Sequence, residues 1–152
     1  MKNEAVQFLA ALIALVLGGA AEELLPKVAG VGFPVLMAAS VFMAMRRRAP
    51  DAVMFAVAAG ALEDALSGLP PATSSSFFLA VAALARWSDF PHGALVMAYP
   101  VYQGWIWIWT MGQLAGGVYG RTLVAVPAGL VTALATWTAL AWMERRAAAD
   151  EP

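Results

Sequence analysis

The 152-residue sequence contains no cysteine and only one histidine, His92. Disulfides, thiolate metal sites and cysteine nucleophiles are therefore excluded. One imidazole cannot form the histidine cluster that binds zinc or haem. Lysine and arginine number 9 and aspartate and glutamate 10, so a net charge of −1 leaves no basic face for nucleic acid. We expect no metal, no cofactor and no nucleic-acid partner.

Charge of either sign is scarce: charged residues make up 12% of the chain, and hydrophobic residues 62%. A soluble domain carries about 25% charged residues, so these side chains could not cover the surface of a soluble globule. A helix that crosses a bilayer needs about 20 residues, which leaves room for roughly six or seven spans and little else. The composition predicts an all-α polytopic membrane protein with a single transmembrane domain, residues 1–152.

Runs without charge, separated by charged or glycine- and proline-rich segments, mark the expected spans. We place these spans at about 5–24, 31–45, 52–67, 74–87, 93–119 and 122–143. Pro34 suits the first turn of the second helix, and Asp51 is a plausible N-cap of the third. Pro100 is expected to kink or interrupt the fifth. The small residues 18–21 also fit a signal-peptide cleavage site, but the equally apolar remainder favours a retained first helix.

The orientation follows from the lysines and arginines in short loops. Six spans with a cytoplasmic amino terminus leave only Lys27 and Arg121 on the outer side. We therefore expect six transmembrane helices with both termini in the cytoplasm. The residues on the cytoplasmic side are then Lys2, Arg46, Arg47, Arg48, Arg86, Arg145 and Arg146.

Small residues recur every fourth position on two of the expected helices. Such stripes let helices approach closely in lipid. Glycine weakens a helix, so a repeated glycine favours a packing role, either within the chain or against a partner helix. The two stripes are Ala10, Ala14 and Gly18 in the first helix, and Gly112, Gly116 and Gly120 in the fifth.

The fifth helix also carries aromatic and polar stripes. Trp105 and Trp109 share one face, and Gln103, Thr110 and Gln113 recur at spacings of seven and three. Tryptophans collect at bilayer interfaces, and polar side chains in a span form interhelical hydrogen bonds. The same residues could instead line a cavity for a small molecule. Both interpretations stay open.

One acid is expected deep in the third span. Counting from Asp51, Asp64 lies about 20 Å into a core about 30 Å thick. A charge there costs several kcal/mol unless it is paired or wetted. Ala56 and Gly60 lie on the same stripe and turn Asp64 toward other helices, whereas Glu63 points about 100° away.

The expected partners of Asp64 lie at the same end of the bundle. They are Ser67, the hydroxyls of 73–76, the free N–H groups where the fourth helix begins, Lys27 and Arg121. Asp64 could pin the turn at 68–76 against the third helix, carry protons, or bind a cationic solute. We favour the structural role, because a proton relay usually needs a second acid or a histidine at similar depth.

This segment resembles the MreD family of bacterial rod shape-determining proteins. The family pattern is Gly-x-x-x-Asp-x-x-Ser-Gly-x-Pro-Leu-Gly, and Pro71-Ala72 replace its closing Leu-Gly here. Substrate-binding S-components of energy-coupling-factor transporters share the fold type and often a similar Gly/Asp helix end. The residues that match the pattern are Gly60, Asp64, Ser67, Gly68 and Pro70.

The resemblance implies a non-enzymatic subunit of the cell-elongation machinery in the bacterial inner membrane. Its expected partners are MreC and, nearby, RodA, a penicillin-binding transpeptidase and MreB. The alternative is a solute-binding transporter subunit that docks a coupling protein through Ala10 and Ala14. We do not expect an enzyme, because Ser74–Ser76 and His92 fall on opposite sides of the membrane and cannot pair.

Overall fold

The computed structural model describes residues 2–24, 34–88, 91–109 and 117–149. Within these ranges every regular element is a helix, so the prediction of an all-α chain with six helices is confirmed. The helices are α1 (Lys2–Leu24), α2 (Val35–Arg46), α3 (Ala49–Ser67), α4 (Thr73–Ser88), α5 (Pro91–Trp109) and α6 (Gly117–Ala149).

The short helix α2 lies at the centre of the bundle and packs against each of the other five helices. Nine of its 12 residues are buried. Leu36, Met37 and Val41 are fully buried, and Ser40 satisfies its hydroxyl by donating to the carbonyl oxygen of Leu36 at 2.8 Å. A helix that is apolar all round is stable only where protein or lipid surrounds it, and here the surrounding helices provide that environment.

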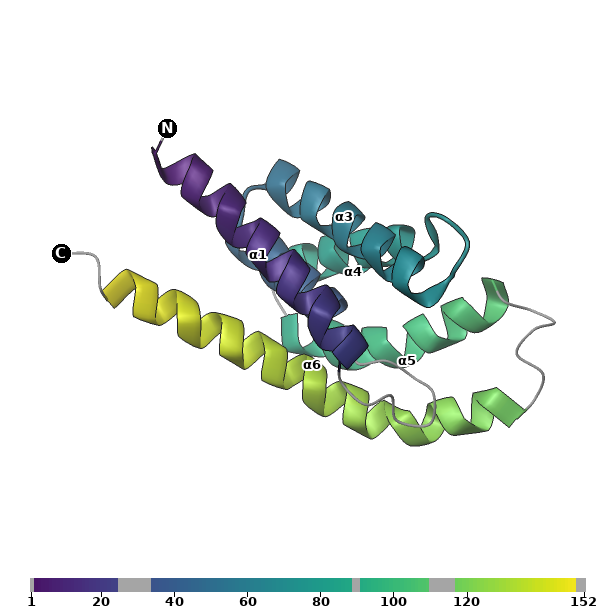
Figure 1. Ribbon diagram of the computed structural model, residues 1–152. Helices are drawn as coiled ribbons and strands as arrows, with labels where there is room; N and C mark the ends of the chain where they lie inside the picture. The colour runs from purple at the N-terminus through teal and green to yellow at the C-terminus, as the bar shows by residue number, and fades with distance from the viewer. Residues whose placement is uncertain (1, 25–33, 89–90, 110–116, 150–152) are drawn as a thin grey trace.

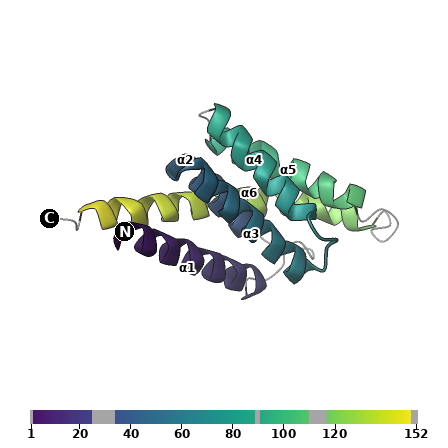
Figure 2. The same ribbon diagram turned by 90° about the horizontal axis from the view of Figure 1, so that it is seen from above.

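The helices α1 and α4 lie on opposite sides of the α2–α3 pair (Figure 2). The long helix α6 passes along the other face and contacts α2 and α5 (Figure 1). Both chain ends lie at the same end of the molecule in the two views. The α2–α3 connection lies at this end too, as do the last turn of α4 and the first turn of α5 (Figure 1).

Small side chains dominate the contact between α2, α3 and α4. Ala38, Ala56, Ala59 and Ala85 are all fully buried. Without a large side chain between them, the backbones approach closely. Close approach through small residues stabilises helix pairs where hydrophobicity alone does not drive association.

Large apolar side chains also lie on the outside of the bundle. Among the described residues, no helix combines the length and the apolarity needed to cross a membrane. Outward apolar residues nevertheless occur on five helices. Examples, one from each, are Leu17, Met54, Trp87, Met97 and Val131, which are 64%, 67%, 89%, 69% and 68% exposed.

Two predicted helix starts need correction. Pro34 is the N-cap of α2 and has a non-helical backbone, so it precedes the first turn. Arg48, not Asp51, is the N-cap of α3. Pro50 fits the first turn because its missing N–H has no partner to lose there. Asp51 lies within that turn, where a negative charge complements the helix dipole.

The fifth and sixth helices also differ from the predicted 93–119 and 122–143. Helix α5 is continuous through Pro100 and is described as far as Trp109, and α6 begins at Gly117. Gly120 therefore lies in α6 instead of α5, while Gly112 and Gly116 lie outside the described residues.

Candidate functional site

Helices α3 and α4 touch backbone to backbone at Gly60. A Cβ atom at this position would lie 2.7 Å from the carbonyl carbon of Ser74, and closer still to N and Cα of Ser75. Ordinary contacts of a Cβ atom measure 3.4–4 Å. Only glycine fits here, because the obstructing atoms belong to the backbone and cannot rotate away.

The turn between these helices uses two residues with left-handed backbones. Gly68 ends α3 with a φ of 64°, and the carbonyl oxygen of Asp64 accepts from the N–H groups of Gly68 and Leu69. This is the usual glycine C-cap. Ala72 has a φ of 68°, which disfavours a side chain. The glycine of the MreD pattern is replaced at this strained position.

The carboxylate of Asp64 closes the joint between α3 and α4. Its Oδ1 accepts the N–H of Ser74 at 2.7 Å, and the side chain is only 5% exposed. Ser74 lies in the first turn of α4, where N–H groups lack helical partners and the dipole favours a negative charge. Asp64 thus caps the next helix from the preceding one. Its Oδ2 is buried and has no hydrogen-bond partner among the described residues.

Two side chains of α5 form hydrogen bonds with the first residues of α4 at the same place. The hydroxyls of Ser74 and Tyr102 lie 2.6 Å apart, and the indole N–H of Trp105 donates to the carbonyl oxygen of Thr73 at 3.0 Å. The rings of Phe77 and Phe78 pack on Tyr102 at centroid distances of 4.9 and 5.5 Å. Both Thr73 and Ser74 are buried, and Thr73 also donates to the carbonyl oxygen of Pro70 at 2.7 Å. We call Gly60, Asp64, Gly68, Ala72 and Ser74 the α3–α4 corner.

The structure selects among the partners expected for Asp64. It brings Asp64 to the first N–H groups of α4, as one of the alternatives predicted. Ser67 instead donates to Glu63 at 3.0 Å on the exposed side of α3. Lys27 lies outside the described residues, as does the side chain of Arg121.

The structure describes only some residues of the aromatic and polar stripes of α5. Trp105 is half-buried against the core, and its indole is used to hold Thr73. The side chains of Gln103 and Trp109, and residues Thr110 and Gln113, lie outside the described residues. Trp105 thus makes an interhelical hydrogen bond within the chain, and both interpretations of the polar stripe stay open.

The small-residue stripe of α1 faces the interior of the chain. A Cβ atom at Gly18 would meet the side chain of Leu36, and Ala14 packs against the core. Ala10 has no described side chain. The part of this stripe that the structure describes is therefore a contact of α1 with the bundle.

Sequence reasoning missed the contribution of Tyr102. Tyr99, Tyr102 and Trp105 recur every third residue, which places them along one side of α5. That spacing was the available signal. Tyr99 is fully buried and fills the space beside Gly129 of α6, while Tyr102 and Trp105 reach the α3–α4 corner.

The α3–α4 corner is thus a packed joint in which three helices share one polar core. His92 lies beyond the other end of α4 and packs on Trp137 at a centroid distance of 5.4 Å. The hydroxyl of Ser74 pairs with Tyr102, so the described contacts of these groups serve packing. Comparison of the chain with models of protein families, with curated proteins and with solved structures finds no match.

Proposed function

We propose that the chain is an integral membrane protein whose helices cross the bilayer six times. The support is physical: 62% of the residues are hydrophobic, and large apolar side chains lie exposed on α1, α3, α4, α5 and α6. With only 12% charged residues, against about 25% in a soluble domain, the chain has little polar surface to set against these side chains in water. Lipid tails would cover these side chains at no cost.

The positions of the termini and of the cations support the proposed orientation. Both chain ends lie at one end of the bundle, as an even number of spans requires (Figure 1). Arg46, Arg86 and Arg146 lie near helix ends on that side, in the last turns of α2, α4 and α6. Cytoplasmic loops carry the excess of positive charge, so we place this end, with both termini, in the cytoplasm.

Within the membrane, we propose a non-enzymatic scaffold that binds partner transmembrane helices, as in the MreD family. The observation that carries this proposal is the use of the motif acid to join helices. Asp64 is buried and bonded to Ser74, at the point where Gly60 allows α3 and α4 to touch. The motif then makes a rigid joint and leaves the outer helix faces as the contact surface.

The proposed partners are MreC and, nearby, RodA, a penicillin-binding transpeptidase and MreB, in the inner membrane of a bacterium. The outer face of α3 is a suitable contact surface, because Val53, Met54 and Val57 are 45%, 67% and 42% exposed along it. A partner helix could pack there without disturbing the α3–α4 corner, whose residues face α4 and α5.

The transporter alternative is less well supported. It requires a free small-residue face on α1 for a coupling protein, but Gly18 packs against Leu36, and Ala14 against the core. A coupling protein would have to use another face of α1.

Affinity purification of the tagged full chain from its native membranes tests the proposal. A photo-crosslinking residue at Met54 should capture MreC, and one at the buried Ala56 should capture nothing, because no partner can reach it. Recovery of MreC with the first probe alone supports the scaffold. Recovery of an ATPase module, or of no membrane partner with either probe, would overturn it.

A further inference from the structure

Arginines concentrate at the end of the bundle where both termini lie. They occur at the end of α2, in the α2–α3 connection and in the last turns of α4 and α6. Besides the acids whose side chains are not described, such as Glu4 of α1, this end carries Asp51 and Glu144. We call this set the arginine end; it comprises Arg46, Arg47, Arg48, Arg86, Arg145 and Arg146.

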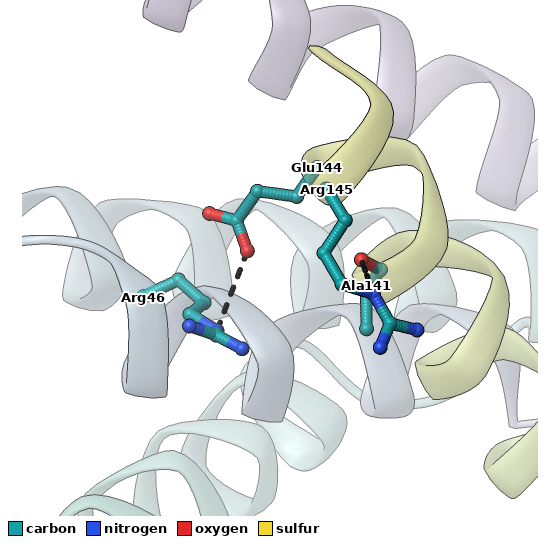
Figure 3. A network of polar contacts seen from close by, with 4 residues as sticks. All are labelled: Arg46, Ala141, Glu144 and Arg145. Atoms are coloured by element: carbon teal, nitrogen blue, oxygen red, sulfur yellow. Dashed lines mark hydrogen bonds and ion pairs between the residues drawn. The ribbon is translucent and has the colours of Figure 1, made fainter. Parts of the chain in front are cut away.

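Two of these arginines make contacts within the bundle. Arg86 donates from Nη1 to the carbonyl oxygens of Ala44 and Arg47, at 2.9 and 2.8 Å. It thereby caps α2, whose last carbonyls lack helical partners. Arg46 pairs with Glu144 of α6 at 3.3 Å (Figure 3), which neutralises one acid and joins α2 to α6.

The positive charges of the other arginines are available to bind an anion. Arg47 is half-buried, and its Nε is buried without a hydrogen-bond acceptor among the described residues. A buried donor without an acceptor is unfavourable, so this side chain gains if it turns toward an anion. Arg48 next to it is exposed. Arg145 is also exposed and bends back to the carbonyl oxygen of Ala141 at 3.2 Å (Figure 3).

Exposed tryptophans accompany these cations. Trp87 follows Arg86 directly and is 89% exposed. Trp142 is 51% exposed, and the guanidinium of Arg146 lies 4.4 Å from its ring centroid. Tryptophan beside arginine at the end of a helix is typical of the level of the lipid headgroups, where the ring is partly in lipid and the cation is at the phosphates.

We propose that the arginine end binds the headgroup phosphate of an anionic phospholipid, with Arg47 and Arg48 as its principal contacts. The guanidinium fork suits phosphate oxygens, with which it forms paired hydrogen bonds. The exposed tryptophans favour a phosphate that belongs to a lipid over a dissolved ion, because they bring the site to the bilayer surface. This inference rests on the proposed bilayer location but not on the identity of any partner protein.

Lipid retention tests the site. The full chain is incorporated into nanodiscs that contain equal amounts of phosphatidylglycerol and phosphatidylcholine, and the lipids that remain bound after extraction are measured by mass spectrometry. We expect retained phosphatidylglycerol to exceed phosphatidylcholine and the excess to fall as salt is raised. Each arginine near a membrane surface changes binding about fivefold, so Arg47→Gln with Arg48→Gln should reduce the preference roughly 25-fold.

Two variants serve as controls. Arg47→Lys with Arg48→Lys keeps the charge and should retain most of the preference. Arg121→Gln removes a cation about 36 Å away along α6 from Arg145, and should leave the preference unchanged. If the glutamine pair does not incorporate, the salt dependence of the unmodified chain and the lysine pair decide the question.

Three results would overturn the proposal. They are equal retention of the two lipids, no larger effect of the glutamine pair than of Arg121→Gln, and displacement of phosphatidylglycerol by inorganic phosphate. The last would indicate a site for a dissolved anion. Failure of the chain to enter nanodiscs at all would instead refute the bilayer location, whereas failure to capture MreC leaves this test intact.

Discussion

Gly60→Ala should destabilise the protein far more than one methyl group normally does. The added Cβ would lie 2.7 Å from the carbonyl carbon of Ser74, where ordinary contact begins at 3.4 Å. To remove this overlap, α4 would have to move roughly 1 Å away from α3, because backbone atoms cannot rotate aside. The hydrogen bond from Ser74 to Asp64, 2.7 Å long, would then exceed bonding distance.

The expected cost combines two terms. Overpacking costs about 1–3 kcal/mol, and a buried N–H without its acceptor costs about 1–3 kcal/mol. We expect a loss of about 2–6 kcal/mol, which corresponds to a fall in melting temperature of roughly 4–24 °C for a chain of this size. The six tryptophans give the signal for thermal unfolding followed by intrinsic fluorescence in detergent.

Gly104→Ala is the matched control. Gly104 lies in α5, and apart from the backbone of its own helix no described atom lies within 4 Å of the position that an added Cβ atom would take. Alanine favours a helix by up to about 1 kcal/mol over glycine. The control should therefore melt at the same temperature as the parent or higher. A Gly60→Ala protein as stable as the control would refute the close contact of α3 with α4.

Four further substitutions probe the α3–α4 corner and the α5–α6 contact, with unfolding in detergent as the measurement. Asp64→Leu should lower the free energy of unfolding by about 1–3 kcal/mol, because the N–H of Ser74 loses its acceptor. Glu63→Gln should change it by no more than about 0.5 kcal/mol, because the hydrogen bond of Glu63 to Ser67 is exposed. Equal effects of the two substitutions would contradict the role of Asp64. Ala72→Gly should stabilise the chain by up to about 1 kcal/mol, because Ala72 has a φ of 68°, and a loss of stability would show that this strain is absent. Gly129→Ala should lower the melting temperature, because its Cβ would overlap the ring of the fully buried Tyr99; no change would contradict the α5–α6 contact.

The helices could be predicted from the sequence because charge-free runs are long here and loops are marked by charge, glycine or proline. The inward direction of Asp64 could also be predicted, since it follows Ala56 and Gly60 on one stripe of α3. Both inferences need only local periodicity, which the amino-acid order contains directly.

The choice of partner for Asp64 could not be predicted. Ser67, the start of α4, Lys27 and Arg121 were all within reach of the expected geometry. The choice depends on how closely α4 approaches Gly60, which is a property of packing between helices. Tyr102 was missed for the same reason: its bond to Ser74 joins residues 28 positions apart.

The helix limits were wrong where local preferences compete. Pro100 is tolerated inside α5, although proline normally breaks or kinks a helix. The sixth helix is longer at both ends than the predicted 122–143, since α6 runs from Gly117 to Ala149. Tertiary contacts such as those of Tyr99 and Tyr102 stabilise the part of α5 around Pro100, and no sequence window contains that information.

The most direct test of the account is whether the two ends of α4 lie on opposite sides of a membrane. The chain has no cysteine, so Ser67→Cys, at the end of α3 on the side where α4 begins, and Ser88→Cys, at the end of α4, each introduce a single reactive thiol. In intact bacterial cells, an impermeant maleimide should label the Ser67→Cys protein, and the Ser88→Cys protein should react only after the membrane is opened. Labelling of both from the same side would contradict the six-span bundle.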